Sequence, residues 1–194
     1  MKKYYIFSLL AIQFLWFESA AQDIPIISRD SLEALLIRAD EHISAYNYEQ
    51  AIDDSYELIN LAKAKDDNVY LAQAYNELGH IYLDTKDTAR AKTNYFLGLQ
   101  YALETKNDTI LMRSYNNLGN IFSEIPETVQ KGIDYYNKVV ELAEKNQDTS
   151  ELMIPLANIG WTYMDSGKFD KGYPYVHKAL KLMDHQRIYH GEEF

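Results

Sequence analysis

Apolar residues along most of the chain recur at the spacing of an amphipathic helix. Within 69–85 they follow the i, i+3, i+4, i+7 rule, which places them on one helix face. The members of this face are Leu71, Ala74, Tyr75, Leu78, Ile81 and Tyr82. Polar breaks at 66–68, 106–109 and 147–149 supply Asp, Asn and Thr residues, which cap helix N-termini. The pattern predicts an all-α fold of consecutive helices.

The helical pattern itself repeats along the chain. A group of four residues returns after 40 positions and again after a further 41. Its copies are Tyr75, Leu78, Gly79 and Tyr82; Tyr115, Leu118, Gly119 and Phe122; and Leu156, Ile159, Gly160 and Tyr163. A small residue follows each copy, at Ala91, Gly132 and Gly172, and a worn first copy retains Leu35, Ala39 and Ala51. Self-similarity at a fixed period indicates a solenoid. Because Gly lowers helix propensity, Gly79, Gly119 and Gly160 predict close approach of another helix.

This spacing resembles the tetratricopeptide repeat (TPR), in which an aromatic residue precedes Leu-Gly, an aromatic follows, and a small residue comes later. The resemblance covers about 30–188 and implies a right-handed solenoid of antiparallel helix pairs. Its four repeats are expected at about 30–68, 69–108, 109–148 and 149–188. Since the family repeat has about 34 residues, the longer period predicts longer helices. The residues of the repeated four-residue group, and the small residue that follows each copy, are the expected repeat-packing positions.

The N-terminal residues 1–21 have the composition of a secretory signal peptide. Lys2 and Lys3 are followed by an almost wholly apolar run over 4–17 and by the small residues of 19–21. We expect cleavage before Gln22, with 22–29 as a linker and 189–194 as a tail or the start of a further repeat. An uncleaved anchor is the alternative. The apolar run is short for a membrane span, so the mature chain is expected to lack an integral one.

The predicted location is therefore outside the cytoplasm. We expect an exported protein, periplasmic or extracellular, or membrane-associated if it is part of a longer protein. The formal net charge is −10, which disfavours nucleic acid because phosphates require a basic surface. A neutral or basic protein or peptide is the better-matched partner. The chain has no Cys, so the repeats must be stabilised by packing alone.

The sequence contains no recognisable catalytic or cofactor-binding motif. Without Cys there is no thiol nucleophile and no thiolate metal site. The five His residues do not form a metal-binding helix motif, and the Gly residues do not form a phosphate-binding loop. We therefore expect neither an enzyme nor a bound cofactor or metal. A weak cluster of His185 and His190 with nearby acids is better explained as a solvated tail.

One polar constellation is a candidate binding site. The TPR resemblance implies that the first helix of each pair lines a concave groove, with side chains flanking Leu-Gly directed into it. The corresponding residues are Asn76, Glu77 and His80; Asn116, Asn117 and Asn120; and Ala157, Asn158 and Trp161. An Asn amide both donates and accepts, so a ladder of Asn suits an extended peptide backbone. The alternatives are that the amides bridge neighbouring helices or face water, and that Trp161 is buried packing.

The last helix, expected around 170–187, carries more apolar residues than one contact face needs. They are Tyr173, Val176, Ala179, Leu180, Leu182 and Met183. Part of this surface should be exposed, and exposed apolar patches mark partner sites. We therefore expect self-association through the C-terminal helix pair, or a longer natural product.

These observations favour an exported protein- or peptide-binding module whose groove takes an extended segment of a partner. The alternative is the extracytoplasmic input portion of a bacterial sensor kinase or transcription regulator whose output domain is absent from this sequence.

Overall fold

The computed structural model describes residues 29–189, and every regular element in that range is helical. The α-helices are α2 (Arg29–Ser44), α3 (Tyr48–Ala64), α4 (Asn68–Asp84), α5 (Thr88–Glu104), α6 (Asp108–Ser123), α7 (Val129–Lys145), α8 (Met153–Asp165) and α9 (Phe169–Tyr189). Two short 3₁₀ helices, η1 (Pro126–Thr128) and η2 (Ser150–Leu152), precede α7 and α8. The predicted signal peptide and the linker up to residue 28 lie outside the described residues.

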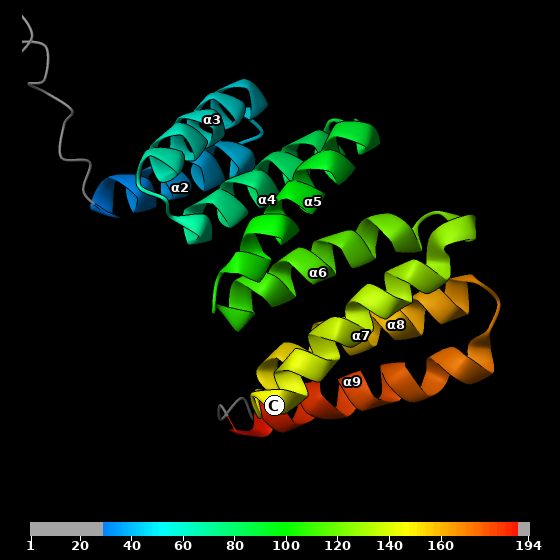
Figure 1. The fold of residues 1–194 in the computed structure, drawn as a ribbon. Helices are drawn as coiled ribbons and strands as arrows, with labels where there is room; N and C mark the ends of the chain where they lie inside the picture. Colours follow the sequence, from blue (N-terminus) through cyan, green and yellow to red (C-terminus); the bar gives the residue numbers. More distant parts are fainter. Residues whose placement is uncertain (1–28, 190–194) are drawn as a thin grey trace, which may run out of the picture.

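The helices pack as four consecutive pairs stacked along one direction. Figure 1 shows α2 and α3 at one end and α8 and α9 at the other. The first helices α2, α4, α6 and α8 contact one another in order. Among residues 29–189, the backbones of the second helices α3, α5, α7 and α9 do not come within 8 Å of one another. The stack is therefore tighter on the side of the first helices, which makes that side the inner one. The predicted all-α solenoid of helix pairs is confirmed.

Polar residues in the breaks start several helices. The Asp67 carboxylate accepts hydrogen bonds from the backbone N–H groups of Val69 and Tyr70, at 3.1 and 3.3 Å. Asn107 accepts one from Ile110 N–H at 3.2 Å. These caps satisfy N–H groups that have no partner within their own helix. The capping predicted for the polar breaks is confirmed at 66–68 and 106–109. At 147–149 the N-cap residue Thr149 makes no side-chain cap hydrogen bond, and Asp148 Oδ1 accepts one from Ser150 N–H at 3.1 Å instead.

Glycines set the close contact within each pair. The Tyr95 ring of α5 covers Gly79 of α4, and the Tyr136 ring of α7 covers Gly119 of α6. In the last pair, a Cβ on Gly160 would lie 2.6 Å from Val176 Cγ2. A side chain at any of these positions would displace the facing helix, so the predicted close approach is confirmed.

A continuous apolar core runs between the two layers of helices. It includes fully buried Leu78, Leu118 and Ile159 on the first helices, together with Tyr95 and Tyr136 on the second. Of the recurring aromatic residues, Tyr75 and Tyr115 are only half-buried, and Tyr75 stacks on Tyr101 with ring centroids 5.5 Å apart. Because the core is continuous, the first helices keep a fixed spacing along the inner side of the stack.

Candidate functional site: the inner groove

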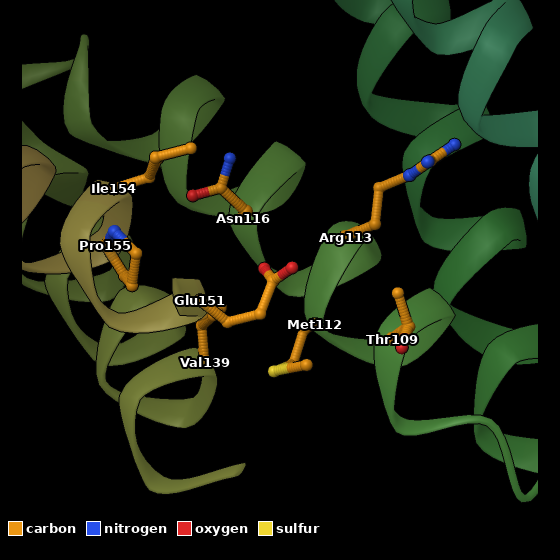
Figure 2. Close-up of a pocket in the computed structure, with 8 residues that line it drawn as sticks. All are labelled: Thr109, Met112, Arg113, Asn116, Val139, Glu151, Ile154 and Pro155. Atoms are coloured by element: carbon orange, nitrogen blue, oxygen red, sulfur yellow. The ribbon is translucent and has the colours of Figure 1, made fainter. Parts of the chain in front are cut away.

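The inner groove is the surface that α2, α4, α6 and α8 present on the tight side of the stack. A hollow of about 200 Å³ lies between α6 and α8, and Met112, Arg113 and Asn116 line one side of it. Figure 2 shows Glu151 and Pro155 on the opposite side, with the Glu151 carboxylate central among the labelled side chains. A second hollow of about 370 Å³ joins α2, α4 and α6.

The asparagines of the predicted ladder bond mainly to one another. Asn117 Nδ2 donates to Asn76 Oδ1 at 3.3 Å, which joins α6 to α4. One repeat later, Asn158 Nδ2 donates to Asn116 Oδ1, also at 3.3 Å, which joins α8 to α6. Asn76 Nδ2 also donates to Ser114 Oγ at 3.0 Å. We call these two Asn–Asn hydrogen bonds the asparagine rungs.

The asparagine rungs show that part of the predicted groove lining is wrong. Asn76 is fully buried and Asn117 is 4 % exposed, so neither amide lies on the groove surface. A buried amide is costly unless it is hydrogen-bonded, and the neighbouring repeat supplies the partners. The amides of Asn76 and Asn117 therefore bridge neighbouring helices, which is the alternative to a place in the groove. Asn116 and Asn158 are half-buried, and Asn116 also lines the hollow between α6 and α8.

Glu77 takes the position on α4 that Asn117 has on α6, but in a different environment. Its side chain is 13 % exposed, and its Oε1 lies 3.8 Å from Arg113 Nη1, a long ion pair. Burial raises the pKa of Glu77 to about 7, with Arg113 opposing the shift and Asp40 adding to it. His80, one turn further along, packs its ring edge-on against Tyr95, and burial lowers its pKa. A largely buried carboxyl group with a raised pKa therefore lies next to Arg113.

Arg113 is the main groove residue that the sequence analysis missed. It is half-exposed, borders both hollows and extends toward Glu77 of α4. It lies five positions before Leu118, one turn outside the positions chosen next to Leu-Gly. The signal that could have identified Arg113 as a functional residue is its charge in an otherwise apolar turn of the helix.

The C-terminal part of the groove is apolar. Trp161 and Ile154 of α8 are exposed, so Trp161 is not buried packing. Asn120 is half-buried, and its Oδ1 accepts a hydrogen bond from Tyr136 O–H at 2.8 Å.

Within residues 29–189, no three His, Asp or Glu side chains are grouped so as to hold a metal ion. No helix in that part of the chain has the length and apolar composition needed to cross a membrane.

The fold and this groove define an all-α, TPR-like helical solenoid, a class of repeat protein that supports protein interactions. Residues 72–99 match a model described as a tetratricopeptide repeat, which supports the resemblance noted in the sequence. No curated protein matches the chain.

Solved structures share the fold at low sequence identity. The structure of BtubC (BKLC) from P. vanneervenii is 17 % identical with a TM-score of 0.72, over 96 % of this chain and 78 % of that one. A structure of MamA is 20 % identical with a TM-score of 0.59, over 80 % of each chain. A second MamA structure is 19 % identical with a TM-score of 0.58, over 84 % of this chain and 78 % of that one. At such identities the likeness concerns the fold alone.

Proposed function

We propose that this protein is an exported, non-enzymatic module that binds an extended segment of a partner protein in the inner groove. The observation that carries the proposal is the position of Arg113. Its half-exposed guanidinium lies between two hollows, and within residues 29–189 its ion pair with Glu77 is long, at 3.8 Å. Guanidinium offers several N–H donors, which suit the carbonyl or carboxylate oxygens of a peptide.

The groups around Arg113 also suit a polypeptide. Glu151 and Glu33 are acceptors on the two hollows, and the Asn116 amide lies between Arg113 and α8. A peptide backbone presents donors and acceptors alternately, so a groove with both kinds of group can bind it. Further along, exposed Trp161 and Ile154 offer an apolar surface for a partner side chain.

Export and charge complete the proposal. The signal-peptide composition of 1–21 supports export of the protein from the cytoplasm, and the net charge of −10 favours neutral or basic segments over nucleic acid. A TPR-like stack typically serves as a scaffold, since it offers an extended surface rather than an enclosed catalytic site.

A peptide library tests the groove directly. Random linear peptides displayed on phage would be selected on the purified protein, and the affinity of a selected peptide measured by fluorescence anisotropy. Arg113→Ala should weaken binding about tenfold or more, because charge-assisted hydrogen bonds contribute about 1.5–3 kcal/mol.

The matched control is Arg90→Ala. Arg90 lies on α5, on the opposite layer, where it pairs with Asp87 at 2.6 Å. This variant should bind the peptide with unchanged affinity. Circular dichroism would verify that both variants are folded. Equal affinities for wild type and Arg113→Ala would place the peptide elsewhere and refute the proposal.

A further inference from the structure

Three lysines lie over aromatic rings where the second helices α5 and α7 leave part of α6 between them (Figure 1). Lys92 Nζ and Lys131 Nζ lie 4.9 and 4.1 Å from the centroid of the Phe122 ring. Lys138 Nζ lies 5.3 Å from the centroid of the Tyr115 ring. We call this surface the lysine–aromatic patch, and its members are Lys92, Lys131, Lys138, Phe122, Tyr135 and Tyr115.

The rings hold the three ammonium groups at the surface. All three lysines are exposed, whereas Phe122 is 2 % exposed. The Tyr135 ring stacks on Phe122 with centroids 5.7 Å apart and lies 6.1 Å from the Tyr115 ring, so the rings form one continuous surface. A cation over a ring is attracted by the negative face of the ring. Because this attraction already positions the lysine side chains, binding to them costs less side-chain entropy.

The three ammonium groups have no acidic partner within residues 29–189. None of them lies within 4 Å of a carboxylate oxygen in that range, whereas Lys145 of α7 pairs with Asp108 at 3.5 Å. Asp134, one turn from two of the lysines, accepts a hydrogen bond from Gln130 instead. The chain has 29 Asp and Glu against 19 Lys and Arg, so acids are not scarce. The patch is therefore a local concentration of positive charge on an acidic protein.

The second helix pair contains the same arrangement in a neutralised form. Arg90, which is shifted by 41 positions from Lys131, lies 4.3 Å from the centroid of the Tyr82 ring. There the Asp87 carboxylate pairs with Arg90 at 2.6 Å. The residue that corresponds to Asp87 before α7 is Thr128, also shifted by 41 positions. The cation over the ring is thus paired with an internal acid in the second pair, and the third pair lacks that acid.

We propose that the lysine–aromatic patch binds an acidic segment of a partner protein, with carboxylates on both sides of an apolar or aromatic side chain. Each ammonium group has three N–H donors for carboxylate oxygens. The half-buried rings of Tyr115 and Tyr135 offer an apolar surface for the side chain between the carboxylates. The patch lies on other helices than most of the inner groove, and the proposal does not depend on binding in that groove.

Charge complementarity decides the kind of partner. An acidic segment is attracted by the three lysines and repelled by the rest of a chain with a net charge of −10, so the patch is where it would bind. A nucleic acid needs an extended basic surface along its phosphates, and three cations on an acidic chain do not form one.

A subtractive selection tests the proposal. A phage library of short random linear peptides is first depleted on the variant that combines Lys92→Gln, Lys131→Gln and Lys138→Gln, and then selected on the wild-type protein. The enriched peptides should be rich in Asp and Glu next to Phe, Tyr or Trp. Fluorescence anisotropy of a labelled enriched peptide should show a dissociation constant raised about threefold by Lys131→Gln and about tenfold or more by the combined variant. Added NaCl should weaken binding.

Two variants serve as controls. Lys131→Arg keeps a cation over the ring and should bind the peptide as the wild type does. Lys178→Gln also removes one positive charge, but on α9, where Lys178 pairs with Glu144 at 3.4 Å, and it should leave the affinity unchanged. Since all the substituted side chains are exposed, circular dichroism should show folded variants.

Three results would overturn the proposal. The first is a selection that enriches no acidic peptides. The second is an enriched peptide that binds the wild type and the combined variant equally well. The third is binding of a labelled single-stranded DNA that depends on the three lysines while no acidic peptide binds, which would assign the patch to nucleic acid.

Discussion

The joint between the second and third helix pairs and the open side of the fourth pair use the same repeat positions differently. At the joint, Asn76 is buried and bonds to Ser114 and Asn117 of α6. In the fourth pair, the corresponding position is Ala157, which faces an uncovered hollow. A repeat position therefore has no fixed role. Within residues 29–189, it makes hydrogen bonds between repeats where another pair covers it and lines an open hollow where none does.

A large effect on stability is expected in the closed interior. Gly119→Leu should destabilise the protein by about 1–3 kcal/mol, because the added side chain would overlap the Tyr136 ring. Urea unfolding followed by circular dichroism measures the change. Leu180→Ala, at an exposed position of α9, is the comparison and should shift stability by less than about 0.5 kcal/mol. Equal losses for the two variants would remove the distinction between closed and open positions.

The next effect concerns the pH dependence of stability that Glu77 causes. The pKa of Glu77 is raised to about 7 in the folded state from an ordinary value of 4.5. The folded state therefore keeps this proton longer, and the stability that it contributes is lost as the pH rises through about 7. Glu77→Gln, which cannot ionise, should become more stable relative to wild type by about 2–3 kcal/mol between pH 4 and pH 8.

Thermal unfolding at several pH values would record this difference. Glu141→Gln, on the exposed surface of α7, controls for removal of one acidic charge. The neighbouring Arg113, Asp40 and His80 are the same in Glu77→Gln and wild type, so the difference isolates residue 77. A constant stability difference from pH 4 to pH 8 would show that Glu77 ionises as a solvated carboxylate.

The asparagine rungs give a graded effect, which is largest at the buried rung and smallest at the half-buried one. Asn76→Ala should cost about 1–3 kcal/mol, because it leaves the buried partners Ser114 and Asn117 with fewer hydrogen bonds. Asn158→Ala should cost less, about 0.5 kcal/mol, since its partner Asn116 can bond to water instead. Chemical unfolding of the two variants side by side provides the measurement. A larger loss of stability for Asn158→Ala than for Asn76→Ala would contradict the structure, in which Asn76 is the more deeply buried of the two.

Most of the fold could be predicted from the periodic pattern. The helix pairs and the close contacts at Gly79 and Gly119 follow from residues that recur at each repeat, so comparison of the copies exposes them. Gly98 was missed because its counterparts are Val139 and Ala179. A Cβ at Gly98 would lie 2.8 Å from Asn76 Oδ1, so this glycine makes room for the first rung only.

The site was only partly predictable because spacing gives the helix position but not the direction of the side chain. Asn76 and Asn117 lie at the border between the groove and the neighbouring helix. Which side each amide takes depends on how closely α4 and α6 approach, and this is a property of the packed stack. Arg113 was missed for the opposite reason, since it has no basic counterpart in the other repeats, where Glu33, Gln73 and Ile154 stand at its position.

Hydrogen–deuterium exchange with a selected peptide tests most directly whether the inner groove is the binding surface. Binding there should slow exchange in α4, α6 and α8, at 68–84, 108–123 and 153–165. Exchange in α5 and α7, at 88–104 and 129–145, should remain as in the free protein. Protection confined to α5 and α7, with no change in the first helices, would contradict the assignment of the binding surface to the inner groove.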